Sequence, residues 1–131
     1  MGNAVTPHIL ICEDDVIIRL GYEASIDDLT GGNAEVDMLS QPDVRAYLEG
    51  VAEEDVLHQC VLEPLIPGAM ELAGKLMNKG TMIFGITSAS QDEISTGPFN
   101  VLARKPLLSR EFERIVADLL NQQGIGCIPT R

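Results

Sequence analysis

The residues in this sequence with the clearest chemical potential are three adjacent carboxylates, Glu13, Asp14 and Asp15. They come directly after residues 8–12, a short run of apolar and β-prone residues that predicts a buried strand. Adjacent carboxylates at the end of a strand repel one another, and a shared cation relieves that repulsion. A hard divalent metal ion or a nearby lysine ammonium would serve. The sequence therefore predicts a cation opposite this acidic run, with Asp15 better placed to cap the helix that follows.

Strands and helices are predicted to alternate along the whole chain. Apolar residues recur at helical spacing over 18–29, and Gly31 ends that helix. The later elements are expected as strand 34–39, a helix capped by Ser40 and reaching Val51, strand 56–62, helix 70–79, strand 81–86, strand 101–103 and a helix capped by Ser109. Between 88 and 100 the helical signal is weak, so a helix there is short or missing. This alternation with short connections predicts a parallel sheet with helices on both faces.

Composition limits the classes of function that are plausible for this chain. A length of 131 residues with 45% apolar content fits one domain. Twenty acidic and nine basic residues leave a formal charge of −11, which repels nucleic acids and anionic membranes. No apolar run is long enough for a membrane span, so a cytoplasmic protein is expected. Cys12, Cys60 and Cys127 lack the spacing of metal ligands and are expected as thiols in a reducing compartment.

Four groups of residues are expected to meet at one edge of the sheet. The carboxyl ends of parallel strands share an edge, and ligand crevices form there where the winding reverses. This rule brings Glu63, Thr87 and Lys105, each at the end of a predicted strand, beside Glu13 and Asp14. Because Lys105 carries the one positive charge among these side chains, its burial beside the carboxylates is electrostatically favoured.

These residues, in this order, resemble the receiver domain of two-component response regulators over about residues 8–122. The resemblance implies a flavodoxin-like, doubly wound, five-stranded parallel sheet in the order 2-1-3-4-5. It leaves residues 1–7 as a leader and 123–131 as a tail. In that family the carboxylate after the third strand is an aspartate that accepts a phosphoryl group from a histidine kinase.

The resemblance also implies a role for each residue at this edge. Glu13 and Asp14 match the acidic pair that holds Mg²⁺, and the backbone carbonyl of Leu65 matches a further metal ligand. Thr87 matches the hydroxyl that senses the phosphoryl group. Lys105 matches the lysine that pairs with it, and the Lys105-Pro106 peptide bond is expected to be cis. Whether Mg²⁺ occupies the site is left open, because Lys105 can itself neutralise the carboxylates.

Two departures from the family pattern fall at the phosphoacceptor position. Glu63 stands where the family has aspartate, and its extra methylene would displace an acyl phosphate from Thr87 and Lys105. Its carboxylate can instead pair directly with Lys105 and imitate the phosphorylated state. Pro64 follows, so the amide N–H that the family uses to bind a phosphoryl oxygen is missing. Leu102 is a third departure, since it takes the place of an aromatic residue common in the fifth strand.

The sequence is best interpreted as an atypical stand-alone receiver, a pseudo-receiver of phosphorelay signalling that acts by binding proteins. A bacterial cytoplasmic protein is expected, with a histidine kinase or another signalling protein as partner and homodimer formation left open. One alternative is a working phosphoacceptor regulator. A second is a Mg²⁺-dependent phosphatase or phosphotransferase, which is disfavoured because His8 and His58 are expected away from the carboxyl edge. The chain is therefore not expected to be an enzyme.

Overall fold

The structure is a computed structural model that describes residues 6–50, 57–88 and 97–125. Five strands lie in these ranges: β1 (His8–Cys12), β2 (Glu35–Leu39), β3 (Gln59–Leu62), β4 (Met82–Thr87) and β5 (Val101–Arg104). The helices of the described part are α1 (Val16–Thr30), α2 (Gln41–Glu49), α3 (Ala69–Asn78) and α4 (Ser109–Gln122). The alternation of strands and helices predicted from the sequence is confirmed.

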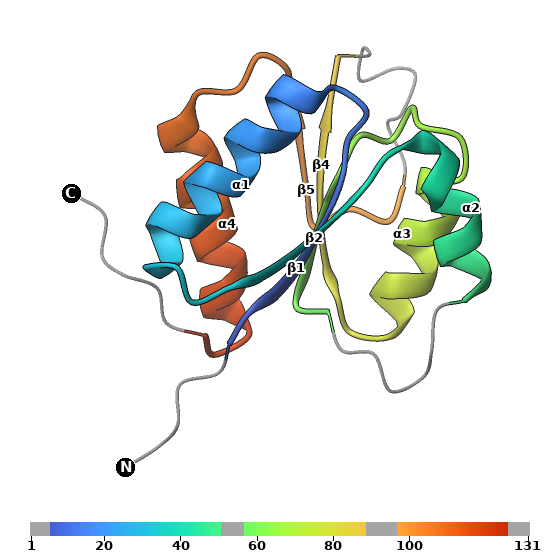
Figure 1. Cartoon of the computed structure of the whole chain (residues 1–131). Coiled ribbons are helices and arrows are strands. Elements are labelled where there is room, and N and C mark those ends of the chain that lie inside the picture. Colours follow the sequence, from blue (N-terminus) through green and yellow to red (C-terminus); the bar gives the residue numbers. More distant parts are fainter. Residues whose placement is uncertain (1–5, 51–56, 89–96, 126–131) are drawn as a thin grey trace.

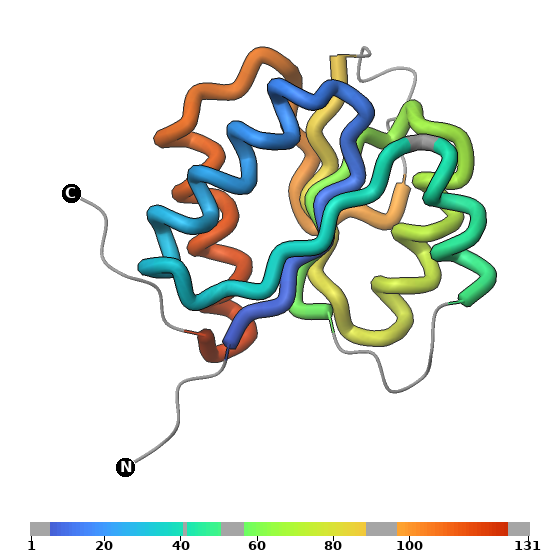
Figure 2. The backbone as a smooth tube through the Cα atoms, in the orientation of Figure 1, coloured from blue at the N-terminus to red at the C-terminus, as the bar shows by residue number. Residues whose placement is uncertain are grey.

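The strands form one parallel sheet in the order β2-β1-β3-β4-β5. Helices α1 and α4 cover one face, and α2 and α3 cover the other (Figure 1). The predicted doubly wound α/β architecture and strand order are therefore confirmed. The tube drawing in Figure 2 shows that the chain leaves β1, β3 and β5 at the same edge of the sheet, where the site residues were expected.

Each face of the sheet has its own hydrophobic core, and the central strand β1 contributes to both. Leu10 and Cys12 pack with residues of α2 and α3, whereas Ile9 and Ile11 pack with residues of α1 and α4. This alternation follows from the period of two along a strand. All four side chains are completely buried, so β1 is covered on both faces, as expected for a central parallel strand.

Helix ends agree with the predicted caps in part. The Asp15 carboxylate accepts hydrogen bonds from the backbone N–H groups of Ile17 and Ile18, which confirms it as the N-cap of α1. Ser40 is the N-cap of α2, but its hydroxyl contacts the Asp43 carboxylate rather than the backbone. The prediction for Ser109 was wrong, because it is the first residue of α4 and Leu108 precedes it as N-cap. Helix α4 therefore begins one residue earlier than expected from Ser109 as its cap.

Some predictions fall on residues that the structure does not describe. The expected end of the second helix at Val51, the expected strand start at residue 56, the segment 89–96 and Cys127 all lie outside the described ranges. The third strand begins at Gln59. Cys12 and Cys60 are buried free thiols, as expected. Across residues 6–50, 57–88 and 97–125, the membrane-span criterion of length and apolarity is met by no helix.

Two histidines join β1 to the start of β3 at the amino edge of the sheet. The His8 backbone N–H donates to Nδ1 of His58 over 2.9 Å, and the His58 backbone N–H donates to the His8 carbonyl, also over 2.9 Å. On the other side, Nε2 of His8 lies 2.7 Å from the Asp37 carboxylate of β2. Burial, followed by the charge of His8, lowers the pKa of His58. An acceptor at Nδ1 also requires the neutral ring.

We predict that acid weakens this connection. The folded protein holds the His58 proton less tightly than the unfolded chain, so the stabilisation present above the ordinary histidine pKa of about 6.5 is lost as the pH falls through the lowered value. Chemical denaturation at a series of pH values should show this loss in the native protein. His58→Asn keeps an acceptor at the same place without a titrating group, and it should flatten that part of the profile. Parallel profiles for the two proteins would contradict this account.

Candidate functional site

The pairing of strands brings the site residues together at the carboxyl edge. Cys12 and Leu62 are neighbours in the register of β1 and β3, so the residues that follow them, Glu13 and Glu63, emerge side by side. The Glu63 backbone N–H donates to the Cys12 carbonyl over 3.0 Å, which continues the pairing by one residue. Between β4 and β5, the Lys105 backbone N–H donates to the carbonyl of Thr87 at the end of β4, over 2.8 Å.

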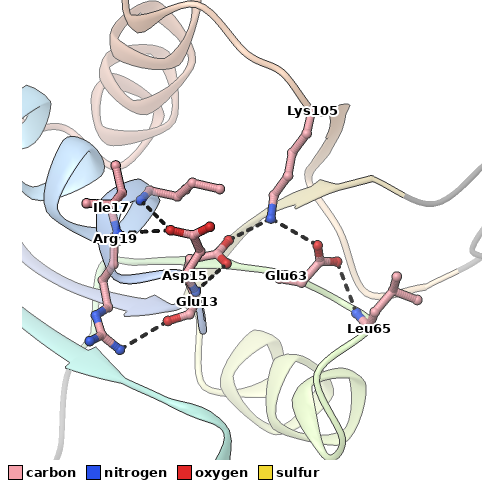
Figure 3. Close-up of polar contacts among 8 residues, drawn as sticks. Glu13, Asp15, Ile17, Arg19, Glu63, Leu65 and Lys105 are labelled. Carbon is pink, nitrogen blue, oxygen red and sulfur yellow. Dashed lines mark hydrogen bonds and ion pairs between the residues drawn. The ribbon is translucent and has the colours of Figure 1, made fainter.

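Lys105 bridges the two glutamates with its ammonium group. Its Nζ lies 2.9 Å from Oε1 of Glu13 and 3.2 Å from Oε1 of Glu63 (Figure 3). The side chains of Glu13, Glu63 and Lys105 are 5%, 10% and 19% exposed, so the three charges are largely withdrawn from water. The direct pairing of Lys105 with Glu63 that the sequence indicated is therefore confirmed. We call these three side chains the acid-lysine bridge.

The charges of the bridge stabilise the protonated lysine. Burial is the largest single influence on Lys105 and by itself lowers the pKa. The hydrogen bonds and charges of Glu13 and then Glu63 together outweigh it, so the pKa of Lys105 is raised. Because the folded protein holds the Lys105 proton more tightly than the unfolded chain, the protonated lysine contributes its full stabilisation below the ordinary lysine pKa of about 10.4, as long as both carboxylates are ionised. The contribution of the lysine proton is lost as the pH rises through the raised pKa.

The second oxygen of each glutamate is held by a backbone amide. Oε2 of Glu13 accepts from the Asp15 N–H over 3.0 Å, and Oε2 of Glu63 accepts from the Leu65 N–H over 3.1 Å (Figure 3). Pro64 has no N–H, so Leu65 supplies the first amide after Glu63 that can donate. Both carboxylates are therefore bound at both oxygens, by Lys105 on one side and by their own loops on the other.

The remaining residues predicted for the site lie close in the fold but outside the bridge. Thr87 is buried at the end of β4, and Asp14 is exposed directly after Glu13. Leu65 is exposed, and its backbone amide donates to the Glu63 carboxylate. The Lys105-Pro106 peptide bond is cis, as the resemblance implied.

The negative field of the site extends to two side chains that the sequence did not single out as site residues. Burial, followed by the charges of Asp14 and Glu13, raises the pKa of the Cys12 thiol to about 12. Burial, followed by the charges of Glu13 and Glu63, raises the pKa of Tyr22 above its ordinary range. Tyr22 lies on the apolar face of the first predicted helix. That periodicity placed it in the core but contained no signal for its nearness to the carboxylates.

While the bridge is formed, Glu13 and Glu63 already have a cation, the Lys105 ammonium. A hard divalent cation needs several oxygen ligands that are free to coordinate it. Both oxygens of Glu13 and both of Glu63 already accept hydrogen bonds or ion pairs. Across the described ranges, His, Cys, Asp and Glu side chains form no group of three that could hold a metal ion. A metal ion would therefore have to compete with Lys105 for Glu13.

Comparison with known proteins identifies the fold. Neither a protein-family model nor a curated protein matches the sequence. A response regulator receiver protein from Sinorhizobium medicae WSM419 superposes with a TM-score of 0.71 at 18% identity, over 88% of this chain and 95% of that one. A CheY-like receiver domain protein from Methanospirillum hungatei JF-1 superposes with a TM-score of 0.69 at 19% sequence identity, over 92% of this chain and 98% of that one. A receiver protein from Burkholderia phymatum superposes with a TM-score of 0.71 at 17% sequence identity, over 95% of this chain and 100% of that one.

These superpositions cover 88–95% of this chain. The chain therefore has the receiver-domain fold of two-component response regulators, with a five-stranded parallel sheet in the order 2-1-3-4-5. At identities of 17–19% the likeness concerns the fold. The chemistry of the site depends on its own residues.

We predict that Lys105→Met destabilises the protein by about 2–3 kcal/mol, because it leaves two buried carboxylates without their cation. Urea denaturation at neutral pH measures this loss. Adding Glu13→Gln and Glu63→Gln to Lys105→Met removes the uncompensated charges and should restore most of the lost stability. A change below about 0.5 kcal/mol in the single variant, a size typical of exposed ion pairs, would show that the bridge contributes little to the fold.

Proposed function

We propose that this protein is a pseudo-receiver, a receiver-like protein that signals by binding other proteins and accepts no phosphoryl group at the usual position. The observation that carries the proposal is the ion pair between Glu63 and Lys105. It joins the residue at the phosphoacceptor position to the lysine that would otherwise pair with a phosphoryl group. The side chain of Glu63 thereby supplies, within the chain, the negative charge that phosphorylation would add.

The geometry of Glu63 disfavours transfer of a phosphoryl group to it. A carboxylate attacks phosphorus with a lone pair of one oxygen, and each oxygen of Glu63 already has a partner that lowers its nucleophilicity, Lys105 on one and the Leu65 N–H on the other. Positioning and electrostatic stabilisation account for nearly all of the catalysis of phosphoryl transfer. Here Pro64 cannot donate to a phosphoryl oxygen, and the extra methylene of Glu63 moves any adduct away from Thr87.

The charge of the site also opposes phosphorylation. The bridge contains two carboxylates and one ammonium, and Asp14 and Asp15 add further negative charge at its mouth. A phosphoryl group would enter this field with its cation already engaged, and like charges at short range repel strongly where water is excluded. The bridge thus supports a single stable arrangement of the carboxyl edge.

The proposed mode of action is recognition of this fixed arrangement by a partner protein. A histidine kinase, another regulator or a second copy of the chain would bind it in a bacterial cytoplasm. The net charge of −11 disfavours nucleic acid as partner. Catalysis is also disfavoured, because the described histidines, His8 and His58, pair at the amino edge of the sheet, away from the carboxylates.

We predict that the intact mass of the protein does not change on incubation with Mg²⁺ and a small-molecule phosphodonor such as acetyl phosphate. Glu63→Asp combined with Pro64→Ala shortens the acceptor and restores the missing N–H, so this double variant should gain the mass of one phosphoryl group. Glu63→Asp alone, which keeps Pro64, is the matched control that separates the effect of the shorter acceptor from that of the restored N–H at residue 64. A stable, acid-sensitive adduct at Glu63 in the native protein would overturn the pseudo-receiver proposal and favour a working regulator.

Removal of the lysine should create a need for an external cation. We predict that millimolar Mg²⁺ raises the thermal midpoint of Lys105→Met, because Glu13 and its acidic neighbours lose their internal cation and attract a hard metal ion. The native protein should show a much smaller shift, since its carboxylate oxygens are already bound. Glu13→Gln added to Lys105→Met is the control and should abolish the effect. An equal stabilisation of the native protein would mean that Mg²⁺ and Lys105 bind together.

A further inference from the structure

A cavity of about 290 Å³ lies between α1 and α4, beside the acid-lysine bridge. Its wall includes four residues of α1, the segment that follows β5 and an aromatic residue of α4: Ile18, Gly21, Tyr22, Ser25, 105–107 and Phe112. Volumes near 300 Å³ are at the lower end of the range for small-molecule pockets. The cavity shares Lys105 with the bridge but is formed mainly by side chains that take no part in it.

Gly21 in α1, like Gly74 in α3, is a glycine that neither backbone conformation nor packing requires, but only Gly21 of the two lines the cavity. It lies inside α1 with φ in the negative, helical region, so its backbone conformation does not require glycine. A Cβ atom at this position would meet no heavy atom within 4 Å, so packing does not require glycine either. Glycine inside a helix is destabilising relative to alanine. What the absence of a side chain at Gly21 does provide is open space on the cavity side of α1.

The wall of the cavity suits a flat apolar molecule. The rings of Tyr22 and Phe112 stack with their centroids 4.5 Å apart and their planes within 7°. Both line the cavity together with Ile18 and Leu107, and aromatic rings pack favourably against the faces and edges of other rings. Ser25 adds a hydroxyl that can bond to one polar group of a ligand. The available volume limits such a molecule to one or two rings.

The charge beside the cavity selects against anions. Lys105 is the charged side chain of the wall, but its ammonium is already paired with Glu13 and Glu63. The bridge as a whole therefore carries one excess negative charge. The same carboxylates raise the pKa of Tyr22, which indicates that their negative potential reaches the cavity wall.

We propose that the cavity between α1 and α4 is a binding site for a small, uncharged, planar aromatic molecule of one or two rings. The inference does not depend on the pseudo-receiver proposal, because the cavity and Gly21 are the same whether or not Glu63 accepts a phosphoryl group. A bound molecule would lie against Lys105 and would couple a chemical signal to the bridge.

The test is a titration of the isotope-labelled full chain with indole, followed by the amide resonances in nuclear magnetic resonance spectra. We expect saturable shifts concentrated in α1, in residues 105–107 and in the first turns of α4. Gly21→Leu places a side chain beside the cavity and should weaken binding about ten-fold or more. Ala24→Leu adds the same side chain to an exposed position of α1 outside the cavity and should bind indole as the native protein does. Thermal melts check that both variants fold.

Two further ligands test the charge and the source of the ring. Indole-3-acetate carries a carboxylate and should bind about three-fold more weakly than indole or worse, because of the negative field. N-acetyltryptophan amide presents the same ring on a peptide backbone and should also bind more weakly than indole, because the cavity is too small for the added backbone. Tighter binding of this amide would assign the cavity to an aromatic side chain of a partner protein and overturn the proposal. Absence of saturable shifts with indole, or equal affinity in Gly21→Leu, would overturn it as well.

Discussion

The ammonium group of Lys105, held between Glu13 and Glu63, is the interaction on which the carboxyl edge of this protein depends. Two carboxylates at the ends of neighbouring strands would repel one another in a site with little access to water. The lysine removes that repulsion from within the chain, and the backbone amides of Asp15 and Leu65 hold the remaining oxygens. All four carboxylate oxygens of Glu13 and Glu63 therefore have partners within the chain.

The receiver fold explains why these three side chains meet. A parallel sheet places the ends of β1, β3 and β5 at one edge, and the register of β1 with β3 makes Glu13 and Glu63 neighbours. Hydrophobic cores on both faces hold the strands that carry these residues against the helices. The fold is that of signalling receivers, whereas the pseudo-receiver proposal rests on two residues at this edge, Glu63 and Pro64.

Much of this arrangement could be predicted from the sequence, because it depends on strand ends and on charge. The edge that brings Glu63 and Lys105 together follows from the alternation of strands and helices, and their pairing follows from their opposite charges. Details that depend on side-chain rotamers and loop geometry could not be predicted. The Leu65 amide on Glu63 and the start of α4 at Ser109 belong to this group. The cavity beside Gly21 could not be predicted either, because hydrophobic periodicity shows which face of a helix is apolar but not where packing leaves a cavity.

The most direct test of the central claim is a crystal structure of the native protein grown in a high concentration of Mg²⁺. The account predicts that Nζ of Lys105 remains within hydrogen-bonding distance of both Glu13 and Glu63, with no metal ion between them. A Mg²⁺ ion coordinated by Glu13, Asp14 and the Leu65 carbonyl, with Lys105 displaced from Glu13, would contradict it. That result would show that the bridge is a resting arrangement of a working metal site.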